Sequence, residues 1–193
     1  MISSQLIEEA ESLLRESVGR YQRPPLALFE LATLKGQELA DQFDAQKDIV
    51  KLGSLFMDCV LPQAIAEGRV SEHISMSWDK ASEMIGKYPE VSDEEKENIR
   101  HCVLEHHGVD SFYSLESEVC CNADCYKFLS VEGIMINIRG NSDLSTPDLM
   151  KLLSNKVDEK WSAISMSGVR EDLAGQHDAI KEFLKTFLER VGE

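Results

Sequence analysis

The chain has 193 residues, with 20 Lys and Arg against 35 Asp and Glu, for a formal net charge of -15. This length is typical of one domain, and so acidic a surface repels phosphate backbones and anionic lipid, so we expect no nucleic-acid and no membrane partner. No apolar run approaches the ~20 residues of a membrane span. The first residues carry acids where a signal peptide would carry Lys or Arg, and the five cysteines fit no disulfide framework, which predicts a cytoplasmic protein with reduced thiols.

Apolar residues recur at helical spacing along the N-terminal half of the chain. The first stripe runs from Leu6 to Val18, and the following "RYQRPPL" is typical of a helix end and a new start. A second helix is expected over about residues 26–42 and a third over about 48–61, ending near Pro62. A fourth helix carries one apolar stripe and closes at "GKYP"; the stripe consists of Ile74, Trp78, Ala81 and Ile85.

The C-terminal half also has the pattern of helices. Ser92 and Glu95 form a capping box that predicts a fifth helix, ending before Gly108. A sixth is expected over about residues 115–136, and Thr146 before a proline predicts the first of two C-terminal helices. Strand-like alternation is confined to a few residues around "IMINI", so the chain is predicted to be all-α.

Asp58 is the one carboxylate in the apolar run "LGSLFMDCVLP". On a helix it would share a stripe with Ser54 and Lys51, where solvent could hydrate it. The alternative is a buried carboxylate, which must be paired or bound to a metal. The preceding residue, Met57, shares a face with Val50 and is expected to point inward.

Asp124 is a second acid at a core-like position, because at helical spacing it lies among Cys121, Cys125 and Phe128. That placement favours an ionic partner or a metal, and a capping or core hydrogen-bond role is the alternative. The pattern C-C-x3-C inside an apolar helix is typical of core thiols and does not have the loop spacing of a zinc knuckle.

Two histidines have positions from which they could reach a metal. His106 continues the inward stripe of the fifth helix, although a structural role at a helix C-terminus is the alternative reading. His73 lies beside the stripe of the fourth helix, near its start. The sequence contains no phosphate-binding glycine loop and no G-x-S-x-G elbow.

The order of these segments resembles the HD-domain superfamily of metal-dependent phosphohydrolases, over roughly residues 24–191. These are all-helical domains whose metal ligands come in the order His, a His-Asp pair and a distant Asp. "KDIVKLGSLFMDCV" resembles the helix that carries the pair, with Asp58 in the place of its aspartate. "IRHCVLEHHG" and "SLESEVCCNADCYKFLS" resemble the later histidine helix and the final aspartate, which places His106, or alternatively His107, and Asp124 at matching positions. "EHISMSWDKASEMI" resembles the segment where some members carry a further ligand, here His73.

The chain departs from the family pattern at two positions. Met57 stands where the histidine of the pair is expected, and the first histidine falls at about Phe29. The resemblance implies an HD-like core at about residues 24–140, with helices at about 146–191 packed on it.

The resemblance implies a metal set of Asp58, His73, His106 and Asp124, which could hold a divalent ion such as Mn, Fe, Ni or Zn. The implied function is a metal-dependent phosphohydrolase acting on a small phosphate ester or nucleotide, with an impaired or altered metal site. The alternative is a catalytically inactive HD-like module that binds a ligand or regulates. A third interpretation is a helical domain whose resemblance is one of fold only.

Overall fold

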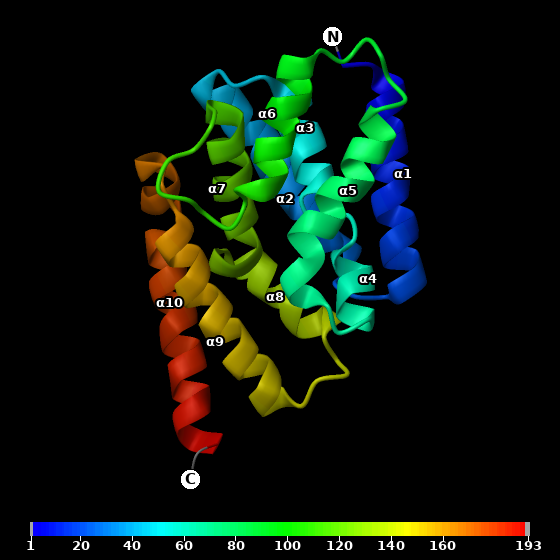
Figure 1. The fold of residues 1–193 in the computed structure, drawn as a ribbon. Helices are drawn as coiled ribbons and strands as arrows, with labels where there is room; N and C mark the ends of the chain where they lie inside the picture. Colours follow the sequence, from blue (N-terminus) through cyan, green and yellow to red (C-terminus); the bar gives the residue numbers. More distant parts are fainter. Residues whose placement is uncertain (1, 192–193) are drawn as a thin grey trace.

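The computed structural model describes residues 2–191 (Figure 1). These residues form helices joined by turns and loops, with no strand in that range, so the predicted all-α class is confirmed. The segment "IMINI" is helical as well. In chain order the elements are α1 (Ser4–Tyr21), α2 (Leu26–Phe43), α3 (Lys47–Phe56), α4 (Leu61–Ala66), the short 3-10 helix η1 (Val70–Glu72), α5 (His73–Ile85), α6 (Asp93–Leu104), α7 (Leu115–Leu129), α8 (Val131–Gly140), α9 (Thr146–Ala163) and α10 (Ser167–Val191).

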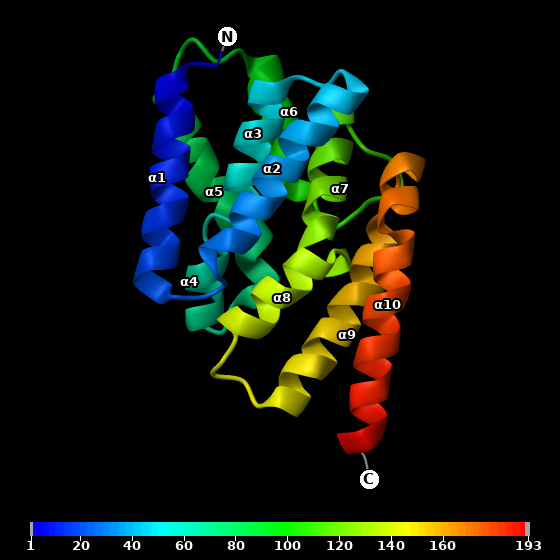
Figure 2. The same cartoon turned by 180° about the vertical axis from the view of Figure 1, so that it is seen from behind.

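Helix α7 lies at the centre of the bundle, with α2, α3 and α6 on one side and α9 and α10 on the other (Figures 1 and 2). Small side chains let its neighbours approach closely, and Cys120, Ala123 and Cys125 are fully buried. All five cysteines are free and buried, so they act as small core residues. The first turn of α7 is fixed by Glu116, which accepts hydrogen bonds from the backbone N–H of Gln46 (2.9 Å) and from Asn98 Nδ2 (3.0 Å).

Several predicted helix ends are confirmed by their caps. Ser92 Oγ accepts from the N–H of Glu95, and the Glu95 carboxylate accepts from the N–H of Ser92, so the capping box is complete. Helix α9 begins at Thr146, with Ser145 as its N-cap and the proline in its first turn. The predicted sixth helix is wrong as one piece, because Ser130 ends α7 and caps α8.

The predicted third helix is also wrong in its extent. α3 ends at Phe56, residues 57–60 form a turn, and Pro62 stands in the first turn of α4 instead of ending a helix. Proline is tolerated there because the first turn of a helix leaves its N–H groups without intrahelical partners. The break places Asp58 in a turn, where its side chain does not follow the helical spacing of Ser54 and Lys51.

The segment Lys47–Ala66 is long and apolar enough to cross a membrane by length and composition, which differs from the expectation drawn from the sequence. Within the protein, 72% of its most apolar window is buried. Core helices of this kind pass the same test of length and composition, and α3 packs here against α2, α6 and α7.

Candidate functional site

A cavity of about 460 Å³ is lined by residues of α4, α5, α8 and α9, among other elements. Its floor is polar and buried, and it is formed by side chains from the α3–α4 turn, α5, α7 and α9. These include Asp58, His73, Asp124, Lys127 and Lys160, each less than a tenth exposed. The turn between α3 and α4, which the sequence pattern did not predict, is what brings Asp58 to this floor.

The ammonium group of Lys127 lies between the two carboxylates. Its Nζ is 2.7 Å from Asp58 Oδ2 and 2.7 Å from Asp124 Oδ1. Burial alone would raise the pKa of Asp58, but the Lys127 charge holds that pKa well below its ordinary value. Asp58 is therefore an ionised, buried carboxylate with a partner, and the hydrated stripe considered from the sequence does not form.

A second buried lysine completes this cluster. Lys160 Nζ lies 2.6 Å from Asp124 Oδ2, so both oxygens of Asp124 contact ammonium groups. Burial lowers the pKa of each lysine, but the neighbouring carboxylates outweigh it and the net shift is upward. Two carboxylates and two ammonium groups are charge-neutral together, so this part of the floor requires no further cation.

The imidazoles of His73 and His106 face the oxygen of Asp58 that Lys127 leaves free. Their Nδ1 atoms lie 2.6 Å from the carbonyl oxygen of Val70 and 2.7 Å from that of Val103. A carbonyl oxygen only accepts, so Nδ1 carries the hydrogen, and in a neutral imidazole Nε2 then presents a lone pair. These Nε2 atoms are 3.4 and 3.6 Å from Asp58 Oδ1.

Acceptor atoms therefore converge on one point of the cavity floor. Asp58 Oδ1 and His106 Nε2 are buried and have no hydrogen-bond partner in the protein. Burial also lowers the pKa of His73, because desolvation outweighs the nearby carboxylate, and this favours the neutral ring. Lone pairs that face one another repel unless a cation or a hydrogen-bond donor lies between them.

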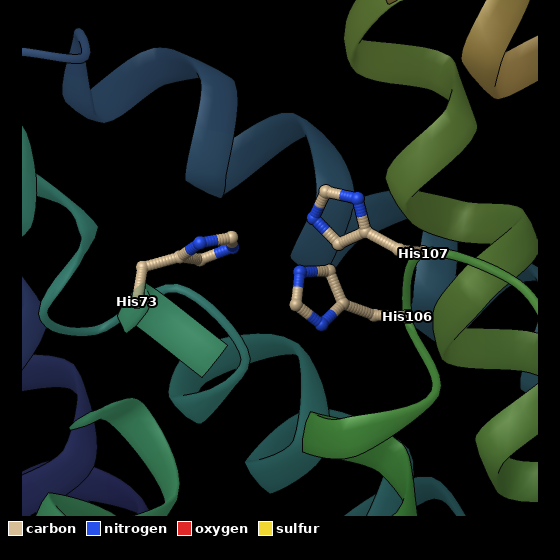
Figure 3. Close-up of side chains that lie close together, drawn as sticks. All are labelled: His73, His106 and His107. Carbon is tan, nitrogen blue, oxygen red and sulfur yellow. The ribbon is translucent and has the colours of Figure 1, made fainter. Parts of the chain in front are cut away.

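His107 joins the same group (Figure 3). His73, His106 and His107 each offer a ligand atom, and these atoms all lie within 4.8 Å of one another. Nδ1 of His107 lies 2.9 Å from Glu159 Oε1. This carboxylate–histidine contact leaves Nε2 as the atom that could ligate a metal. Burial lowers the pKa of His107 to about 4, with His106 and Lys160 adding to the shift. The sequence offered His106 or His107, and the structure brings both together.

The residues therefore fit one transition-metal ion at the three imidazoles, and Asp58 is not among the residues whose ligand atoms all lie within 4.8 Å of one another. They do not fit an ion shared by Asp58 and Asp124, because the Lys127 ammonium already lies between those carboxylates. The structure brings three of the predicted ligands (Asp58, His73 and His106) together, whereas Asp124 contacts Asp58 through Lys127 and the backbone carbonyl of His106 through Lys160.

The two positions that depart from the family pattern differ in the structure. The ring of Phe29 lines the cavity with Lys127 Nζ 5.1 Å from its centroid, a cation–π contact. Met57 is fully buried, as predicted, but does not line the cavity.

Lys127 and Lys160 were not predicted from the sequence as residues of the site. The spacing of Asp124 and Lys127, three residues apart on a helix, is a local signal for the first pair. No local signal identifies Lys160, which is 36 residues from Asp124 by its number and reaches it from α9.

Comparisons of the chain with protein-family models, with curated proteins and with solved structures find no match. The resemblance to HD domains stays a prediction, and the function has to be argued from the site.

Proposed function

We propose that this protein is an HD-like, metal-dependent phosphohydrolase with an altered metal site, acting on a small phosphate ester. One divalent transition-metal ion (Mn, Fe, Ni or Zn) would be held by His73, His106 and His107, with Asp58 Oδ1 facing two of these imidazoles. The observation that carries the proposal is the group of three imidazoles whose ligand atoms all lie within 4.8 Å of one another, two of them facing a buried Asp58 oxygen that has no hydrogen-bond partner. Such an ion would supply a water of lowered pKa and polarise a phosphoryl oxygen.

The protein's own residues give the site its charge and its orientation. Lys127 binds one oxygen of Asp58 and so leaves the other directed at the histidines. The buried carboxylates and ammonium groups sum to zero charge, so a divalent ion at neutral imidazoles would give the floor a net charge of about +2. A site with two divalent ions, two carboxylates and no lysines would have the same net charge of about +2. Lys127 and Lys160 would therefore supply the positive charge of a second divalent ion. A net charge of this sign suits a phosphate dianion.

A second candidate function is a ligand-binding or regulatory module without turnover. The observation that favours it is the pairing of both oxygens of Asp124 with lysines. Those contacts stabilise the site without any ion, so the cavity could keep its shape and bind a phosphorylated ligand that it does not cleave.

Metal analysis of untagged protein, prepared without chelator, tests the metal site first. We expect close to one ion per chain after dialysis against Mn, Co, Ni or Zn. His73→Gln should weaken binding by at least about tenfold, because it removes a ligand. His177→Gln is the matched control, since His177 stacks on Trp161 away from the cavity, and it should bind as the wild type does. Trace metal alone in the wild-type protein would contradict the proposal.

Activity separates the two functions. We expect a screen of phosphomonoesters and nucleotides with added Mn, Co or Ni to find a substrate whose hydrolysis is lost in His73→Gln and kept in His177→Gln. Stoichiometric metal without turnover would favour the binding module. A rate that survives His73→Gln would indicate a contaminating phosphatase.

A further inference from the structure

Polar residues are buried at the floor of the cavity, and apolar residues of its outer part lie near the solvent. Its floor is polar and buried, with Asp124 at 2% and Lys127 at 4% exposure. Its outer part is apolar and open to solvent, with Val70 at 47% and Leu152 at 42% exposure. An apolar rim in contact with water is unfavourable unless something covers it, whereas a charged floor suits a charged group.

Apolar side chains of the rim come from two separate parts of the chain. Leu61 and Ile65 come from α4, and Leu144 and Leu152 come from the start of α9 and the loop before it. The whole cavity, at about 460 Å³, lies within the range of sites for small molecules, so it has room for a tail as well as a charged head.

The charges of the lining are balanced by their ion-pair partners. Among the lining residues are four cationic side chains (Arg23, Lys127, Lys156 and Lys160) and three carboxylates (Asp58, Asp124 and Asp148). Arg23 and Lys156 are also paired with Asp143 and Glu159, which do not line the cavity. The lining therefore has no excess of positive charge of its own, and an anionic head depends on the ion of the proposed function.

We propose that the ligand of this cavity is a soluble phosphate monoester with an apolar tail, its head at the polar floor and its tail along Leu61, Ile65 and Leu152. The choice of phosphate as the head rests on the function proposed above, and the tail rests on the rim alone. The rim gives a reason for selectivity, because each methylene that it covers adds to the binding free energy, and a nucleotide or sugar phosphate cannot cover it equally well.

Binding of n-alkyl phosphates tests this inference in metal-free protein. Butyl, hexyl and octyl phosphate, below their micelle concentrations and with EDTA present, are titrated by calorimetry. We expect the Kd to fall by about threefold to fourfold for each methylene added. In protein dialysed against Mn, octyltrimethylammonium, with the same tail and a cationic head, should bind more weakly than octyl phosphate, because the ion supplies the positive charge of the floor. An affinity independent of tail length, or equal binding of the two octyl compounds, would overturn the proposal.

A cavity-filling variant locates the tail. Ile65→Trp should abolish the gain from butyl to octyl phosphate and keep the binding of butyl phosphate. Met135→Trp is the matched control, since Met135 is 60% exposed on α8 and does not line the cavity, and it should keep the full gain. If Ile65→Trp does not fold, as judged by circular dichroism, the wild-type alkyl series decides the outcome. A full gain in folded Ile65→Trp would overturn the placement of the tail.

Two further outcomes keep this inference distinct from the proposed function. Metal binding and hydrolysis without any dependence on tail length would contradict the binding of an apolar tail but support the proposed phosphohydrolase. An affinity that depends on tail length, in a protein that binds no metal, would support the apolar tail and favour the binding module. Sedimentation with phosphatidic acid vesicles separates a soluble ester from a membrane lipid: we expect no co-sedimentation of so acidic a protein, and binding to vesicles alone would overturn a soluble ligand.

Discussion

Replacing Lys127 with methionine removes one charge and keeps most of the side-chain volume. The ammonium group is the contact that Asp58 Oδ2 and Asp124 Oδ1 share, at 2.7 Å from each. With Nζ gone, Asp58 loses the one ammonium partner that it has among residues 2–191, and Asp124 keeps Lys160. We expect Lys127→Met to destabilise the fold more than any substitution of a surface lysine.

The size of the effect follows from the geometry. At 2.7 Å and an effective dielectric constant of about 20, each ion pair has a gross Coulomb attraction of about 6 kcal/mol. Desolvation of the buried charges offsets most of that attraction, so the pairs contribute much less in net terms. Truncating one partner still leaves a buried carboxylate without compensation, which costs about 3–5 kcal/mol.

Urea denaturation at several pH values measures this change. Burial would raise the pKa of both carboxylates, but the lysines hold both values below that of an unfolded aspartate, about 3.9. Their stabilisation is therefore present above that pH and is lost as the pH falls through the folded-state values. The pKa of Lys127 is raised in the folded protein, so its contribution to stability has a limit at alkaline pH. That contribution is lost only as the pH rises through the folded-state pKa of Lys127. Removing Lys127 raises the carboxylate pKa values, so the loss in Lys127→Met should be large at neutral pH and smaller in acid.

Lys80→Met is the matched control, because Lys80 forms an exposed pair with Glu83 at 2.9 Å. We expect it to change the free energy of unfolding by less than about 1 kcal/mol. Added Mn or Zn should restore part of the stability of Lys127→Met, since two carboxylates without an ammonium group between them can bind an ion. A loss in Lys127→Met as small as in Lys80→Met, or one independent of pH, would refute the bridging role of Lys127.

Three further predictions concern the core. Gly53→Ala should destabilise the fold by about 1–3 kcal/mol in urea denaturation, because the added Cβ would lie 2.5 Å from Cys102 Cβ. Gly19→Ala is the control and should be neutral or stabilising, since nothing lies within 4 Å of its added Cβ. Equal changes in stability in the two variants would contradict the close packing at Gly53. Glu116→Leu should lower the thermal midpoint by an amount equivalent to about 1–3 kcal/mol, since it leaves two donors without an acceptor, and an unchanged midpoint would contradict this role. Cys59 should resist thiol reagents in the native protein at neutral pH and react only after unfolding, because burial raises its pKa to about 12; fast labelling of the folded protein would disagree.

The fold class could be predicted from the sequence, and so could much of the region of the site. Helical periodicity is local, and so is a capping box such as that of Ser92 and Glu95, so both can be recognised without tertiary contacts. The inward position of Asp124 followed from the same periodicity. Helix ends at Phe56 and Ser130 were missed, because a turn inside an apolar run and a serine that ends one helix and caps the next give weak local signals.

The sequence by itself determined the all-helical class, the burial of Met57 and Asp124 and the presence of acids and histidines that could share a site. Only the tertiary structure decided which charges meet. Lys127 contacts Asp58 from 69 positions away, and Lys160 reaches Asp124 from another helix. Whether a buried carboxylate is neutralised by a metal or by an ammonium group depends on groups within a few ångströms in space, and helical spacing specifies only neighbours along the chain.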